Sequence, residues 1–175
     1  MFEDYLEDAS CFANQANKTS DIREAKRYYR ASIFYTMGAV EAFVNYIANT
    51  LAHGPDWPEY EIAFLSDNKF DLEKGSFKII QQAEYHRLED KLRFLLVKFD
   101  PGFDFQGVAA WCRLLEFKEL RDDITHPRSD DDTLVVVDYK KKVESGITAA
   151  IEIMSAIMNG AFGHPLRKKL IDLKF

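Results

Sequence analysis

The sequence predicts an all-α protein, an up-and-down bundle of about four long helices with several short ones. Apolar residues recur at helical spacing over long stretches, and glycine and proline fall mostly between these stretches. The clearest stretch is 31–52, which is apolar almost all round and carries a single charge, Glu41. The 175 residues, 47% of them hydrophobic, predict one globular domain over 1–175, with its core at about 20–160 and a basic tail at 161–175.

The predicted helices follow one another along the chain with short connections. Their expected bounds are 2–17, 21–52, 59–66, 77–99, 105–126 and 139–160, followed by a short basic helix in the tail. Ser20 is the expected N-cap of the second helix and Asp138 that of the last long helix. Both side chains can accept a hydrogen bond from the backbone of a first helical turn.

The connections are predicted from their turn residues. Residues 53–58 contain Gly54 and two prolines, and 100–104 contain Pro101 followed by Gly102. Pro127 is expected to end the helix before it. The polar stretch 66–76 is expected to be a loop, and 133–137 ("TLVVV") a short extended segment.

The apolar stretch 31–52 is long enough to cross a membrane, but its polar content favours another interpretation. It has no second span beside it and no basic flank, and it holds Ser32, Thr36, Asn45, Asn49 and Thr50. We therefore expect a buried helix of a soluble protein, with no membrane partner.

The N-terminus and the cysteines predict a cytoplasmic location. The acidic N-terminus lacks the layout of a signal peptide. Cys11 and Cys112 lack the spacing of a metal site, and we expect both to be reduced thiols.

The charge balance excludes one class of function. The chain carries 29 acidic against 23 basic residues, a formal net charge of −6. Proteins that coat nucleic acid without sequence preference depend on many contacts between basic side chains and phosphates. The sequence therefore argues against that class and leaves room only for a small, local nucleic-acid site.

Arg121 is the first candidate functional residue because of its place on the predicted helix 105–126. At 100° per residue it falls inside the apolar arc, between Ala110 and Leu114, whereas Asp122 and Asp123 fall outside it. A solvated arginine is expected on the polar face. An arginine on the apolar stripe must extend its charged end to the surface, pair with a buried acid, or act at an interface.

Glu41 is the natural partner for this arginine. A glutamate in the apolar stretch is costly to bury unless it is paired or hydrogen-bonded. We predict contact between Glu41 and Arg121, with the side chains within about 6 Å. Asn45 lies one turn after Glu41, and we expect the two to form a satisfied polar pair in the core.

The segment from Arg121 to His126 also resembles a known family. Arg121-Asp122-Asp123-Ile124-Thr125-His126 has the form R-x4-H at the end of a bundle helix, and it is similar to the signature of the HEPN superfamily (higher eukaryote and prokaryote nucleotide-binding domains). The length, the all-α plan and the long second helix resemble this family over about 20–160. The motif is short, and its weight comes from its position late in a long helix, before a proline.

The resemblance implies a metal-independent endoribonuclease that acts on RNA at a homodimer cleft, where the motifs of two subunits meet. It implies His126 as general acid or base for attack of a ribose 2′-hydroxyl on the adjacent phosphate, and Arg121 as the phosphate-holding group. Asp122, where active members often have Asn, would have a supporting role with Glu41 and Asn45. No metal or cofactor is implied.

The family also implies a setting and partners. A bacterial toxin, defence or stress response is the implied setting, with an antitoxin or regulatory protein as a further candidate partner. "HPRS" at 126–129 departs from the H-x-Y ending of toxins that pair with a nucleotidyltransferase, so that system is not assigned.

A non-catalytic HEPN-like module that binds a protein or a nucleotide is the alternative. In that case Arg121 pairs with Glu41 or a helix C-terminal carbonyl, and His126 caps the helix end. A cation site formed by Asp130–Asp132 with Asp122, Asp123 and His126 is a lesser alternative. The two main hypotheses differ in where the motifs of two subunits lie: facing each other across an open basic cleft for the enzyme, buried or apart for the module.

Overall fold

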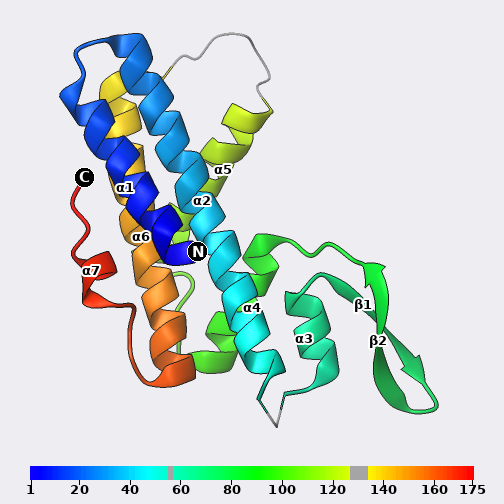
Figure 1. Ribbon diagram of the computed structural model, residues 1–175. Helices are drawn as coiled ribbons and strands as arrows, with labels where there is room; N and C mark the ends of the chain where they lie inside the picture. The colour runs from blue at the N-terminus through cyan, green and yellow to red at the C-terminus, as the bar shows by residue number, and fades with distance from the viewer. Residues whose placement is uncertain (55–56, 127–133) are drawn as a thin grey trace.

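The structure is a computed structural model that describes residues 1–54, 57–126 and 134–175 (Figure 1). Within these residues it contains seven helices and one two-stranded antiparallel sheet. The elements are α1 (Phe2–Lys18), α2 (Ile22–Ala52), α3 (Glu59–Leu65), β1 (Asn68–Glu73), β2 (Ser76–Ala83), α4 (Leu88–Phe99), α5 (Ala109–Thr125), α6 (Val136–Phe162) and α7 (Lys168–Ile171). The predicted helical class is confirmed in its coarse form, but the strands were not predicted.

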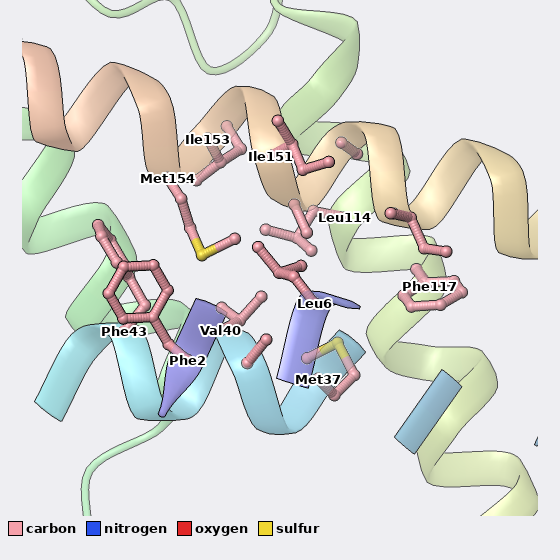
Figure 2. Close-up of a cluster of buried hydrophobic side chains, with 14 of the residues drawn as sticks. Phe2, Leu6, Met37, Val40, Phe43, Leu114, Phe117, Ile151, Ile153 and Met154 are labelled. Atoms are coloured by element: carbon pink, nitrogen blue, oxygen red, sulfur yellow. The ribbon is translucent and has the colours of Figure 1, made fainter. Parts of the chain in front are cut away.

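The long helices α1, α2, α5 and α6 pack on one another around one hydrophobic core. Figure 2 shows its centre, where side chains from all four helices meet. The residues labelled there are Phe2, Leu6, Met37, Val40, Phe43, Leu114, Phe117, Ile151, Ile153 and Met154. Close packing of this kind leaves each helix one orientation, and so decides which of its edges faces outward.

Asp21, not Ser20, caps the start of α2. Its carboxylate accepts hydrogen bonds from the backbone N–H groups of Arg23, at 2.8 Å, and Glu24, at 3.2 Å. These bonds stabilise the charged form and lower the pKa of Asp21 below its ordinary value. The prediction missed by one residue because both side chains suit an N-cap, and the chain enters the helix at Ile22.

The prediction of a loop at 66–76 and a helix at 77–99 was wrong for most of these residues. β1 and β2 form an antiparallel hairpin in which Glu73 pairs with Ser76 across a two-residue turn. Lys74 and Gly75 occupy that turn with φ of 51° and 85°. Positive φ at both positions is the requirement of the turn that best joins two strands. Helix begins only at Leu88.

The hairpin forms strands because its aromatic side chains pack on a neighbouring helix. The Phe77 ring lies 4.9 Å from that of Tyr60 in α3 and 5.7 Å from that of Phe70 across the hairpin. Figure 1 shows the two strands projecting from the bundle beside α3. This tertiary contact overrides the weak helical pattern of the segment.

The starts of α5 and α6 differ from the expected ones. α5 begins at Ala109 rather than 105, after a turn in which Asp104 accepts a hydrogen bond from the backbone N–H of Gln106 at 2.9 Å. α6 begins at Val136, so the expected extended stretch is wrong for its last two residues, and Asp138 is not the cap. Val136 packs against the core, and this burial favours helix over the strand preference of valine. Residues 127–133, which include Pro127 and Asp130–Asp132, lie outside the described residues.

Among the described residues, α6 is the helix long and apolar enough to cross a membrane by length and composition. Residues 31–52, the stretch that the sequence alone suggests by its length, belong to α2. Half of the apolar window of α6 is buried inside the protein, against α2 and α5. This is the behaviour of a core helix in a bundle. The cytoplasmic location stays a prediction.

The C-terminal tail packs against α1. Leu170 of α7 is fully buried, and Lys169 forms an ion pair with Glu7 at 2.6 Å. Ser10 donates a hydrogen bond from its hydroxyl to the Lys174 carbonyl at 2.9 Å. The predicted short helix in the basic tail is confirmed, and its basic residues face the acidic side of α1.

Candidate functional site

Arg121 lies in the last turn and a half of α5, at the edge of the core. Its side chain is 25% exposed, next to the buried Leu120. The position of α5 follows from a close approach to α6, where the Phe117 ring lies against the backbone of Gly146. The guanidinium therefore extends from the apolar stripe to the surface, the first of the three outcomes expected for it.

The predicted contact between Glu41 and Arg121 is confirmed. Arg121 Nη2 donates a hydrogen bond to Glu41 Oε1 at 3.4 Å. Arg121 Nε also lies 3.0 Å from Asp122 Oδ1, but the alignment is not that of a hydrogen bond. Lys118 pairs with the other oxygen of Asp122 at 2.7 Å. Asp122 therefore stands between two cations and holds both side chains at the end of α5.

The expected burial of Glu41 and Asn45 was wrong. The Glu41 side chain is 49% exposed, and Asn45 is exposed one turn further along α2. The packing of α2 turns this edge outward, so neither group needs a partner in the core. A pair as exposed as Glu41 and Arg121 contributes about 0–1 kcal/mol to stability. Because this ion pair is weak, another anion can replace Glu41 as the partner of Arg121.

A pocket of about 300 Å³ opens beside this ion pair. It lies between α2, the exit of the hairpin, α4 and α5. Its lining residues are Glu41, Val44, Asn45, Asp67, His86, Arg87, Leu88, Lys91, Lys118 and Arg121. Two arginines and two lysines line it with two carboxylates, and Asp122 pairs with Lys118 and Arg121 from beside it, in a chain whose net charge is −6. The pocket is therefore a basic site on an acidic protein, the kind of field that attracts an anion.

The prediction missed the residues that form the other wall of this pocket. Asp67 accepts a hydrogen bond from the backbone N–H of His86 at 2.8 Å and one from Lys91 Nζ at 2.6 Å. The His86 ring lies 4.6 Å from that of Phe64, and its Nε2 is shielded without a hydrogen-bond partner among the described residues. Lys91 is only 4% exposed. Lys91 lies on the apolar stripe of α4, just as Arg121 lies on that of α5, and this placement could have marked it as a candidate site residue.

His126 does not line the pocket. It is the C-cap of α5, its side chain is exposed, and its backbone N–H donates to the Asp122 carbonyl at 2.9 Å. The resemblance implies that His126 and Arg121 act at a cleft between two subunits, and within one subunit His126 does not contribute to the pocket beside Arg121. Among the described residues no group of His, Cys, Asp and Glu is placed to hold a metal ion. The acidic residues 130–132 of the cation alternative lie outside the described range.

Comparison of the chain with models of protein families, with curated proteins and with solved structures found no match. The resemblance to the HEPN superfamily therefore depends on the segment Arg121 to His126 and on its place at the end of α5. The geometry alone supports a site for a small anionic group, with an exposed histidine about one and a half helical turns beyond the arginine.

Proposed function

We propose that this chain is a HEPN-type endoribonuclease that acts without a metal ion and as a homodimer. The observation that supports this most is Arg121, which lies at a basic pocket of an acidic protein. Among the described residues, its guanidinium pairs with two acids whose side chains are 43% and 49% exposed. A planar, permanently charged donor in that position suits the phosphate of an RNA strand.

The proposed reaction is an internal transfer at phosphorus. His126 accepts the proton of a ribose 2′-hydroxyl, whose oxygen forms a bond to the adjacent phosphorus as the bond to the 5′-oxygen breaks. The departing 5′-oxygen takes up a proton, and the products are a 2′,3′-cyclic phosphate and a 5′-hydroxyl. Arg121 stabilises the negative charge that develops on the phosphate oxygens.

The dimer is part of this proposal because the pocket beside Arg121 is not lined by the histidine at the end of the same helix. His126 is outside the pocket of its own Arg121. Two α5 ends that face each other would place the histidine of one subunit beside the arginine of the other. Neither residue would have to leave its observed position on the helix.

The experiment is cleavage of pooled tRNA and mRNA in EDTA by the wild-type protein and by His126→Ala. We expect cleavage by the wild type and a loss of about 100-fold or more in the variant, the scale of general acid–base catalysis. His164→Ala is the matched control, because His164 is also exposed but belongs to the C-terminal segment. Equal cleavage by wild type and His126→Ala would show that His126 is not catalytic.

A non-catalytic binding module is the second candidate, favoured by the position of His126 outside the pocket and by the two acids already on Arg121. In this case the pocket binds an anionic ligand and no bond is broken. Folded protein that cleaves neither RNA pool in EDTA, while it still binds RNA, would favour the module over the enzyme.

A further inference from the structure

One side of the pocket is formed by residues outside the R-x4-H motif. This side includes an arginine whose side chain has no partner among the described residues. Arg87 lies at the N-terminus of α4 and lines the pocket, and it is exposed. Its guanidinium makes no hydrogen bond or ion pair with any described residue. Asp67 fixes the backbone beside it through the N–H of His86. Arg87 is therefore a donor that lines the pocket and has no side-chain partner among the described residues.

Tyr85 lies two residues before Arg87 and is unusually exposed. Its exposed fraction is 87%, the highest among the large hydrophobic residues described. The other aromatic rings of the hairpin region, Phe70 and Phe77, contact each other and Tyr60, whereas the Tyr85 ring contacts no other aromatic ring in the described residues. A tyrosine ring left in water, one residue before a residue that lines a basic pocket, offers a face on which an unpaired base can stack.

The size of the pocket suits the phosphate of a nucleotide and leaves its base outside. At about 300 Å³ it lies at the lower end of the range for ligand pockets. Its cationic lining suits a phosphate, and its open edge leaves the base outside. The segment Tyr85–Arg87 spans both regions, because His86 and Arg87 line the pocket and Tyr85 precedes them in the exposed chain.

We propose that this site binds one nucleotide of single-stranded RNA. Arg87 and Arg121 contact its phosphate, and Tyr85 stacks on its base. A base inside a duplex has both faces covered by its neighbours and cannot receive the tyrosine, so duplex RNA binds more weakly. This inference rests on the proposed function in taking RNA as the ligand, and it assigns Tyr85 and Arg87 as binding residues for unpaired RNA.

The experiment measures binding without cleavage. The probe is a short fluorescein-labelled single-stranded RNA in which every 2′-hydroxyl is methylated, so that no internal nucleophile is present. Fluorescence anisotropy gives the dissociation constant at several salt concentrations. The full-length variants are Tyr85→Ala, Tyr85→Phe and Arg87→Ala. Arg167→Ala is the matched control, because Arg167 is an exposed arginine of the C-terminal tail paired with Glu3.

Tyr85→Ala and Arg87→Ala should both weaken binding, but only Arg87→Ala should change the salt dependence of binding. Tyr85→Ala weakens binding by about fivefold to 150-fold, the effect of one stacked base, and leaves the salt dependence unchanged. Tyr85→Phe keeps the ring and binds like the wild type. Arg87→Ala weakens binding and reduces the slope of log K against log salt by about 0.7, the effect of one phosphate contact in a single strand. Arg167→Ala changes neither quantity.

Three results would overturn the inference: no binding of the methylated strand by the wild type, wild-type affinity in both Tyr85→Ala and Arg87→Ala, or equal affinity for a duplex of the same sequence. Circular dichroism establishes that the variants are folded. The two proposals fail separately. His126-dependent cleavage with unchanged binding in both variants would refute only the nucleotide site. The expected binding pattern without any cleavage would refute only the endoribonuclease.

Discussion

At the scale of single residues, the site depends on charged side chains at the edge of the core. Arg121 extends from an apolar stripe and meets Glu41, and Lys91 is buried beside Asp67. The contact between Glu41 and Arg121 could be predicted, because each residue interrupts an otherwise apolar helix face. Lys91 interrupts α4 in the same way, but its partner Asp67 comes from a segment interpreted as a loop. The pair was missed because the loop was not expected to pack.

Glu41→Gln is predicted to strengthen RNA binding without a large change in stability. The ion pair with Arg121 contributes about 0–1 kcal/mol, so the free energy of unfolding in urea should change by no more than about that amount. Affinity for the methylated RNA strand should rise, because a carboxylate that competes with phosphate for Arg121 is gone.

Glu152→Gln is the control for this prediction. Glu152 lies on α6 and pairs at 2.9 Å with Arg113, which is on α5 as Arg121 is. Its side chain is 48% exposed, close to the exposure of Glu41. It does not line the pocket. Anisotropy should show no change in this variant. An unchanged or lower affinity in Glu41→Gln would mean that Glu41 does not compete with the RNA phosphate.

At the scale of elements, the long helices were predicted well and the hairpin was not. Apolar periodicity and the turn residues placed α1, α2 and α6 to within a few residues. The hairpin was missed because Lys74-Gly75 was interpreted as part of a polar loop, although glycine there suits a turn with positive φ. The packing of Phe77 on Tyr60, which stabilises the strands, is a contact between separate segments.

Helix packing can be tested at two glycines. A Cβ at Gly146 of α6 would lie 2.1 Å from the Phe117 ring, so Gly146→Ala must displace α5 or that ring. We expect a net loss of stability of about 1–3 kcal/mol from overpacking. Because α5 carries Arg121, RNA affinity should fall as well.

Gly38→Ala in α2 is the matched comparison. Its Cβ would lie 3.5 Å from the Tyr5 ring, an ordinary van der Waals distance. Alanine has the better helix propensity, so this variant should be as stable as the wild type or more stable by up to about 1 kcal/mol. Thermal and urea unfolding measure both variants. Equal stability in both would mean that α5 and α6 can separate at no cost.

At the scale of the whole molecule, the pocket joins parts of the chain that are far apart in sequence. Glu41 is on α2, Asp67 follows α3, Arg87 begins α4 and Arg121 ends α5. The net charge of −6 gives no sign of this basic site, because the cations gather only when the chain folds. The association of RNA with this pocket should depend on salt concentration, because the pocket attracts an anion while the chain as a whole repels it.

The proposed enzyme requires two copies of the chain. Light scattering coupled to size exclusion should give twice the mass of one chain for the wild type. It should give the same mass for His126→Ala, because an exposed side chain at the end of α5 can be removed without loss of the fold. A monomer at concentrations where RNA is cleaved would contradict the proposed shared cleft.

The helical class, the long helices and the pairing of Arg121 with Glu41 could all be predicted from the amino-acid sequence. These features follow from local periodicity and from the cost of placing a charge on an apolar face. The folded chain was needed to show that Glu41 and Asn45 are exposed and that residues 68–83 form a hairpin. It was also needed to show that Asp67, Arg87 and Lys91 join Arg121 around one pocket. These features depend on how separate elements pack, and packing is a property of contacts between distant residues that no local pattern contains.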